Sequence, residues 1–101
     1  MVKHIVMFKL IEKNKANIDK AVSALKSLKE NIEVVRSIEI GVNFTESERS
    51  YDIVLIVEFS NKEDLSTYGP HPNHVPVIDT IRSLCSDSVV VDYEFNPLNH
   101  K

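Results

Sequence analysis

Apolar and polar positions alternate in four stretches of the chain, with the period of two residues that is typical of β-strands. These stretches are also rich in β-branched and aromatic residues, which favour strands. Polar segments or segments with a different apolar spacing separate them. The sequence therefore predicts four strands, at residues 2–11, 37–42, 51–59 and 88–95.

Between the strands, apolar residues recur every three to four positions, which is the spacing of an amphipathic helix. The first such segment runs from Ile18 to Ile32, about four helical turns. A short second helix is predicted after Ser60, because Ser60 and Glu63 have the spacing of a capping box. A third helix is predicted to carry Val77 to Cys85, with Asn73 as its N-cap.

The order strand, helix, strand, strand, broken helix, strand predicts a ferredoxin-like α+β fold. In this fold an antiparallel four-stranded sheet has the order 4-1-3-2, and its helices lie on one face. A chain of 101 residues is the size of one domain. We expect this domain to span residues 1–96, with residues 97–101 as a C-terminal tail.

The face of the sheet that the helices leave uncovered is also predicted to be apolar. A contiguous exposed patch of this kind is typical of an interface, and a second copy could cover it through a two-fold contact. The sequence therefore predicts a homodimer whose sheets pack face to face, and the alternative is a monomer with one wet face. We place Ile5, Met7, Val54, Ile56 and Val90 on this open face, flanked by Lys3, Asp52, Glu58 and Asp92, and Val89, Val91, Tyr93 and Phe95 on the other.

Composition excludes several classes of partner. The 12 Lys and Arg residues against 15 Asp and Glu give a net charge of −3, so we expect no nucleic acid and no anionic membrane as partner. The apolar runs are too short to span a bilayer, and the first residues do not have the pattern of a signal peptide. Cys85 has no second cysteine to pair with, which favours a reducing compartment, and we expect the cytoplasm.

The segment "YGPHPNH", Tyr68 to His74, concentrates residues that are scarce elsewhere in the chain. It holds two of the four histidines, two of the four prolines and one of the two glycines. Proline disfavours the helical conformation in the residue before it, so Gly69 and His71 are predicted to be extended. The segment should therefore interrupt the helix with a stiff bend.

Three side chains near this bend suggest an acid/base site. At a helix N-terminus the macrodipole favours the neutral imidazole of His74, which can accept a proton. Tyr68 offers a phenol as donor. His4 lies on the strand face that the helices should cover, and the bend begins near that strand. We therefore expect Tyr68, His74 and His4 to be catalytic, with His71 and Phe8 in contact with a ligand.

Simpler interpretations remain open for the same residues. His71 could be a turn residue beside proline, and His74 could be a structural histidine bonded to backbone carbonyls. The two histidines of "HPNH" could bind a metal, but no carboxylate or cysteine cluster accompanies them, so no metal site is predicted. Cys85 lies in the apolar stripe of a helix, where packing is its expected role.

Three segments together resemble the stress-responsive A/B barrel domain (Dabb) family: "KHIVMFKL", "YDIVLIVEFSNKEDLSTY" followed by "HPNH", and "VVVDYEF". The resemblance implies a dimeric α+β barrel. The family includes polyketide cyclases of the olivetolic acid cyclase type, in which a tyrosine and the second histidine of the motif form an acid/base pair. These match Tyr68 and His74, and a first-strand histidine matches His4. The chain differs from the cyclases at Gly69 and Pro70, where bulkier apolar residues are expected.

The expected function is a cofactor-free acid/base catalyst, cyclase-like or lyase-like, on a small carbonyl compound. His74 would remove a proton next to the carbonyl, Tyr68 would donate to the developing oxyanion, and His4 would orient the substrate or His74. The alternative is a non-catalytic dimer that binds a small ligand or supports a stress response. A third possibility is a haem or oxygen site with His74 or His71 as axial ligand.

Overall fold

The computed structural model describes residues 1–97, which contain seven elements of secondary structure. The expected tail lies outside these residues from position 98 onward. The elements are β1 (Val2–Leu10), α1 (Lys15–Asn31), β2 (Ser37–Val42), β3 (Ile53–Phe59), α2 (Lys62–Tyr68), α3 (Val75–Leu84) and β4 (Cys85–Glu94).

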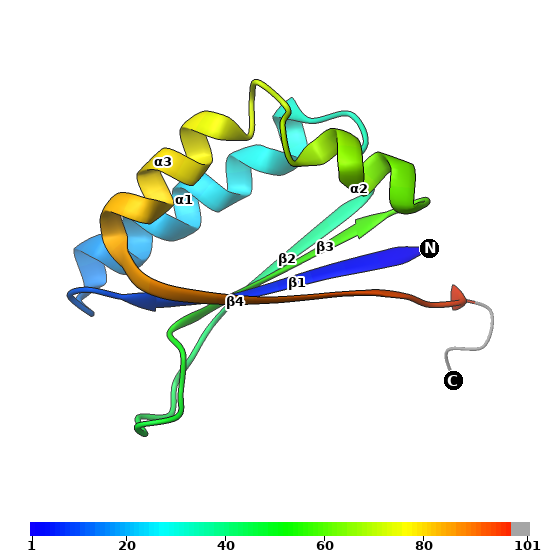
Figure 1. Cartoon of the computed structure of the whole chain (residues 1–101). Coiled ribbons are helices and arrows are strands. Elements are labelled where there is room, and N and C mark those ends of the chain that lie inside the picture. Colours follow the sequence, from blue (N-terminus) through cyan, green and yellow to red (C-terminus); the bar gives the residue numbers. More distant parts are fainter. Residues whose placement is uncertain (98–101) are drawn as a thin grey trace.

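The four strands form one antiparallel sheet in the order β2-β3-β1-β4. All three helices lie on the same side of this sheet, and α3 runs above β4 (Figure 1). The predicted ferredoxin-like topology is therefore confirmed. No helix within residues 1–97 combines the length and the apolar character needed to cross a membrane.

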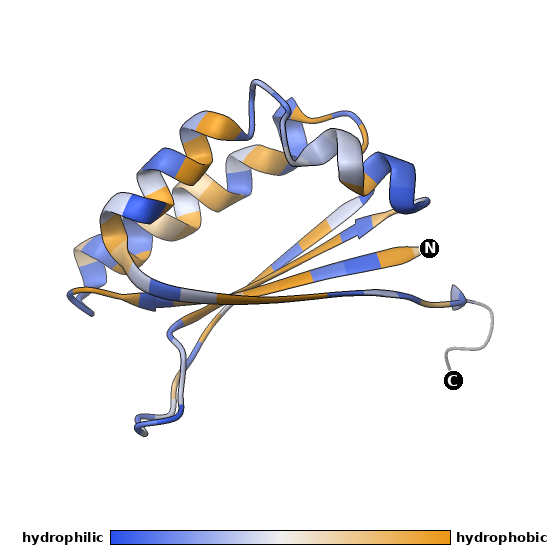
Figure 2. Ribbon diagram, viewed as in Figure 1, coloured by the Kyte–Doolittle hydropathy of each residue, from blue (hydrophilic) through white to orange (hydrophobic). Residues whose placement is uncertain are grey.

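The core lies between the sheet and the helices. Every second residue of β3 is buried there, because β3 has a strand on either side and helices above it. On the helical side, α1 contributes Ala21, Leu25 and Leu28, which are nearly inaccessible to solvent. Figure 2 shows apolar positions recurring along α1 and α3 and alternating along the strands. Burial of these apolar faces is the main force that holds the helices on the sheet.

The helix starts differ in detail from the prediction. The N-cap of α2 is Asn61, whose side chain accepts from the backbone N–H of Asp64 over 2.9 Å. The Ser60 hydroxyl instead lies 3.2 Å from Arg36 Nη1 and accepts from it. Asn is as good an N-cap as Ser, so adjacent candidates leave the start of a helix uncertain by one residue.

The N-cap of α3 is His74 and not Asn73, and its side chain forms no cap hydrogen bond within residues 1–97. The Asn73 amide donates to the backbone carbonyl of Asn31 over 2.8 Å. Since Asn31 is the last residue of α1, this bond ties the bend to the end of that helix.

The predicted break in the helix is confirmed, but one part of its explanation is wrong. Residues 69–74 form turns between α2 and α3. Gly69 precedes a proline and is nevertheless helical, with φ −52° and ψ −57°. The clash that disfavours this conformation involves partly the Cβ of the residue before proline, which glycine lacks. The break therefore begins one residue later than predicted.

The two faces of β4 are reversed relative to the prediction. Val90 is opposite Val6 and therefore shares its helix-covered side of the sheet, whereas Val89 is opposite Met7 on the open side. Three consecutive valines do not reveal which face each one takes. The register with β1 decides the matter, and it places Val91 and Tyr93 on the open side and Asp92 on the helix side.

A β-bulge at the start of β4 adds to this difference. The register with β1 shifts between Lys9, which pairs with Asp87, and Leu10, which pairs with Cys85. Ser86 is the extra residue, and a residue inserted in this way changes which face the following positions take. Cys85 can therefore face inward although the residues after the bulge alternate in the opposite phase.

Asp52 is buried and does not flank the open face as predicted. It is 8% exposed, and its Oδ2 accepts from the backbone N–H of Leu10 over 2.8 Å. Its Oδ1 lies 3.7 Å from Lys13 Nζ. The pairing of β1 with β3 ends at Phe8. The Asp52 carboxylate therefore supplies an acceptor for a backbone N–H beyond the end of that pairing.

We predict that Asp52→Ala lowers the free energy of unfolding by about 1–3 kcal/mol, because it leaves a buried N–H without an acceptor. Urea denaturation of the variant and of wild type measures this change. Asp52→Asn keeps an oxygen acceptor and should cost less. Asp79→Ala, on an exposed part of α3, is the matched control. Equal stability of Asp52→Ala and Asp79→Ala would contradict the prediction.

Candidate active site

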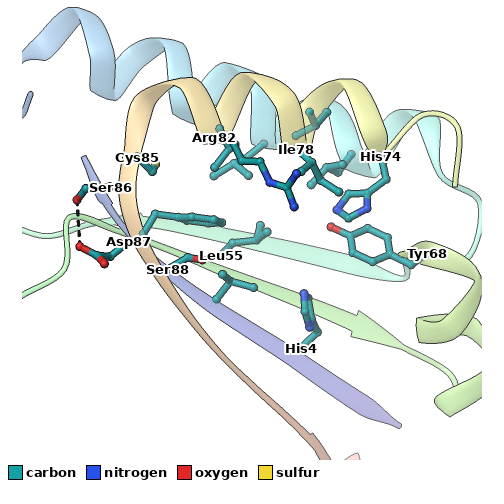
Figure 3. A pocket seen from close by; sticks show the side chains of 16 residues that line it. His4, Leu55, Tyr68, His74, Ile78, Arg82, Cys85, Ser86, Asp87 and Ser88 are labelled. Atoms are coloured by element: carbon teal, nitrogen blue, oxygen red, sulfur yellow. Dashed lines mark hydrogen bonds between the residues drawn. The ribbon is translucent and has the colours of Figure 1, made fainter. Parts of the chain in front are cut away.

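A cavity of about 350 Å³ lies between α3 and the helix-covered face of the sheet. Side chains from β1, β3, β4 and all three helices line it, and most of them are apolar (Figure 3). The size and character of this space suit a small organic ligand. Its apolar wall consists of Val6, Phe8, Leu25, Leu28, Leu55, Val77, Ile78 and Ile81.

Tyr68, the last residue of α2, points its hydroxyl into the cavity (Figure 3). Its ring is 2% exposed and packs on Phe59, with ring centroids 5.1 Å apart. Within residues 1–97 the hydroxyl has no hydrogen-bond partner. Burial raises the pKa of Tyr68 above its ordinary value of 10.0. The group is therefore a neutral phenol near pH 7, free to donate to a ligand.

His74 lies against Tyr68, with ring centroids 4.2 Å apart. Its Nδ1 is 2.8 Å from the backbone carbonyl of Gly69. A carbonyl oxygen only accepts, so Nδ1 carries the proton and donates it, which leaves the Nε2 of the neutral ring with a free lone pair. Burial lowers the pKa of His74, and the nearby His4 and His71 lower it further, although the bond to Gly69 partly opposes this. His74 is therefore a neutral ring at neutral pH, able to accept a proton.

His4 lies on the other side of Tyr68, with ring centroids 5.8 Å apart in an edge-on arrangement. Its Nδ1 is 2.5 Å from Oδ1 of Asp92 on β4. The carboxylate fixes the orientation of the ring, as acids hydrogen-bonded to catalytic histidines commonly do. Asp92 was not predicted as a site residue, because it was expected on the opposite face of the sheet. Only the register of β4 with β1 pairs Asp92 with His4, so the sequence alone held no signal for this contact.

The structure brings four of the five expected site residues to one cavity: Tyr68, His74, His4 and Phe8 all line it. Their chemical roles stay predictions. His71 does not line the cavity, and its expected contact with a ligand stays a prediction. Its Nδ1 accepts from the backbone N–H of Asn73 over 3.0 Å. This is the turn role that was the simpler interpretation, and it follows from the tight bend that the two prolines impose.

Four further polar groups border the cavity and were not anticipated. Arg82 comes from α3, and Ser86, Asp87 and Ser88 come from β4. Cys85 also lines it, but burial raises the pKa of its thiol, and Asp52 raises it further, so the group is a poor nucleophile. Within residues 1–97, no cluster of three or more His, Cys, Asp or Glu side chains could hold a metal ion.

The family model described as the stress-responsive A/B barrel domain (Dabb) matches residues 2–95. The chain belongs to this family. The resemblance seen in the sequence is thereby confirmed over nearly its whole length.

Individual relatives agree with this assignment. A stress-response A/B barrel domain-containing protein of Arabidopsis thaliana is 29% identical over 97 residues. That match covers 92% of this chain but only 36% of the Arabidopsis protein, so the chain spans about a third of that relative's length. A dimeric protein of unknown function from Bacteroides fragilis, with a ferredoxin-like fold, is 34% identical with a TM-score of 0.69. The match covers 93% of this chain and 95% of that one.

A hydroxynitrile lyase from Passiflora edulis shares the fold at 16% identity, with a TM-score of 0.82. The match covers 95% of this chain and 94% of the lyase. At this identity the likeness establishes the common fold alone.

We predict that Tyr68→Phe leaves the melting temperature unchanged or raises it. The substitution removes a buried hydroxyl that lacks a protein partner, and such a group costs about 1–3 kcal/mol when it stays unpaired. Thermal melts followed by circular dichroism test this, with Tyr51→Phe as a control outside the cavity. A fall of several degrees in Tyr68→Phe alone would show that the hydroxyl is paired inside the cavity and would contradict the prediction.

Proposed function

We propose that this protein is a cofactor-free acid/base catalyst, cyclase-like or lyase-like, on a small carbonyl compound. One observation carries the proposal: the bend fixes His74 with its Nε2 lone pair free beside the unpartnered hydroxyl of Tyr68, at the wall of an apolar cavity. A neutral base next to a neutral donor is the arrangement that enolisation requires.

In the proposed step, the ligand places its carbonyl oxygen against the Tyr68 hydroxyl. His74 Nε2 takes a proton from the adjacent carbon, the C–H electron pair moves into the forming C=C bond, and the carbonyl oxygen becomes an enolate. The hydrogen bond from Tyr68 strengthens as negative charge develops on this oxygen. The Tyr68 hydroxyl is itself buried, and this increases the strength of that bond. His4, held by Asp92, orients the ligand from the opposite side of Tyr68.

The Passiflora edulis protein supports a catalytic role, because it is a lyase built on the same fold. Fold alone does not establish activity, so the proposal depends on the arrangement of Tyr68 and His74. The second candidate is a non-catalytic ligand-binding protein, which the predominance of apolar side chains in the cavity wall favours. A haem site has less support, because His71, one of the two suggested axial ligands, lies outside the cavity.

We also propose that the chain forms a homodimer through the open face of its sheet. Cross-strand pairs join Ile5 to Ile56 and Val91, and Met7 to Val54 and Val89, across three adjacent strands. Met7, Val89 and Val91 are 41%, 41% and 54% exposed, and none of the helices in the described part of the chain covers this side (Figure 1). A contiguous apolar surface of this kind is characteristic of an interface. The Bacteroides fragilis relative is described as dimeric, which supports the proposal.

The lone thiol of Cys85 fits a reducing compartment, and we propose the cytoplasm as the location of the protein.

The catalytic proposal predicts that the protein accelerates exchange of the α-protons of ketones with solvent. Proton NMR in D₂O measures the loss of α-proton signal across a panel of medium-chain ketones and oxo acids. His74→Gln should slow the catalysed exchange by about 100-fold or more, because it removes the base. His71→Gln is the matched control, three residues away and outside the cavity. The proposal fails if wild type exchanges no panel member faster than buffer, or if the two variants lose activity equally.

The same exchange rate is predicted to fall at acid pH. His74 acts only when neutral, and its pKa is lowered from the ordinary 6.5, so activity should persist below pH 6.5 and disappear as pH drops through the lowered pKa. The charged and titratable groups facing it are His4, His71, Tyr68 and Arg82. Because the pKa of Tyr68 is raised, no loss should accompany the ordinary phenol titration near pH 10. A rate that already halves above pH 6.5 would contradict this.

The dimer proposal predicts that Ile56→Lys yields monomers or aggregates, because it places an unpaired charge in an apolar contact. Sedimentation velocity at micromolar concentration measures the assembly. Ser23→Lys adds the same charge on the exposed side of α1 and should sediment as wild type does. A wild-type protein that sediments as a monomer would refute the proposal.

A further inference from the structure

Arg82 is the one guanidinium that lines the cavity within residues 1–97. His74, Ile78 and Arg82 follow one another at four-residue intervals, so they form a stripe along the rim side of α3, while Val77 and Ile81 lie deeper. In Figure 3 the Arg82 side chain extends past Ile78 in the direction of Tyr68, so that its guanidinium lies over the apolar side of the cavity. Eight residues of helix separate His74 from Arg82, or about 12 Å along the axis, and this extension shortens the gap.

The guanidinium has no partner inside the described part of the chain: Arg82 forms no ion pair and no side-chain hydrogen bond within residues 1–97. The one carboxylate that also lines the cavity is Asp87, which accepts from the Ser86 hydroxyl over 3.2 Å. In Figure 3 this carboxylate points away from Arg82, at the opposite end of the cavity. Asp79 precedes Arg82 by three residues on α3 but forms no ion pair with it, and Asp92 is paired with His4.

We infer that Arg82 binds a carboxylate group of the ligand, so that the substrate is an oxo acid whose carbonyl lies against Tyr68 and His74. This inference rests on the proposed function, because it concerns the same cavity and names the class of carbonyl compound. The apolar wall between the two polar ends takes the intervening hydrocarbon segment. The oxo group would then accept a hydrogen bond from Tyr68 at the end of α2, and the carboxylate would bind Arg82 on α3.

A single negative charge fits this site better than a phosphate does. One guanidinium matches one carboxylate in a two-point hydrogen bond. A dianionic phosphate would call for additional cationic donors, and among the described residues that line the cavity the other charged side chain is the carboxylate of Asp87. Arg82 also lies in the last turn of α3, where a cation interacts favourably with the helix dipole. That structural role alone would not make ligand affinity depend on ligand charge.

The test compares 4-oxooctanoate with its uncharged methyl ester. Titration calorimetry, or ligand-observed NMR where binding is weak, gives the dissociation constant of each compound for wild type, Arg82→Gln, Arg82→Lys and Lys20→Gln. Lys20→Gln removes the same charge from the exposed side of α1. Melting curves establish that each variant is folded. Binding is measured without turnover, so the outcome is independent of whether the protein catalyses exchange.

Wild type is expected to bind the acid about tenfold more tightly than the ester, as for a charge-assisted hydrogen bond that is partly exposed to solvent. Arg82→Gln should abolish this preference with little effect on the ester, Arg82→Lys should retain part of it, and Lys20→Gln should retain all of it. The inference is overturned if the acid and the ester bind equally to wild type, if the preference survives in Arg82→Gln, or if the acid fails to bind at millimolar concentration. If the acid preference is found while no α-proton exchange occurs, the inference stands and only the catalytic proposal fails.

Discussion

The hydrogen bond from His74 Nδ1 to the Gly69 carbonyl is the contact on which the site depends. It joins the two ends of the six-residue segment between α2 and α3 and so sets the distance between those helices. The same bond selects the tautomer of His74, because the proton must lie on the nitrogen that faces the carbonyl. A backbone feature thereby determines both where the imidazole lies and which of its nitrogens is available to a ligand.

The environment then separates the two partners chemically. Burial makes the charged form unfavourable in both cases, so it holds Tyr68 as a phenol and His74 as a neutral imidazole. One physical cause thus produces a donor and an acceptor side by side. The buried hydroxyl of Tyr68 is an energetic cost in the empty cavity, and a ligand that accepts from it removes that cost.

The sequence was sufficient for the strand order and for the break between the helices. Alternation in the strands and the proline pair at Pro70 and Pro72 are local signals, and local signals specify elements reliably. It was also sufficient to predict that Tyr68, His74 and His4 lie near one another, because the topology places the end of β3 beside the start of β1. The site was therefore predictable to the extent that it follows from the order of the elements.

What the sequence did not reveal depends on contacts between distant segments. The face of each residue in β4 follows from its register with β1, and three consecutive valines carry no information on register. Because that register could not be predicted, the position of Asp92 beside His4 could not be predicted either. The rotation of α3 about its own axis likewise decides that Arg82 reaches the cavity, and spacing within the helix alone does not fix that rotation. Asn61 shows the same limit on a smaller scale, because two adjacent residues were equally good caps.

Under the proposed function, the residues of α3 along the cavity rim would separate catalysis from ligand selectivity. His74 is the N-cap of this helix, while Ile78 and Arg82 lie one and two turns further along it. Residue 78 is only half-buried, so its size can change without opening a hole in the core. Substitutions on these outer turns would therefore alter which ligands enter the cavity while the contact between Tyr68 and His74 stays unchanged. Under the proposed function, the fold would thus change its substrates one helical turn at a time without losing its reactivity.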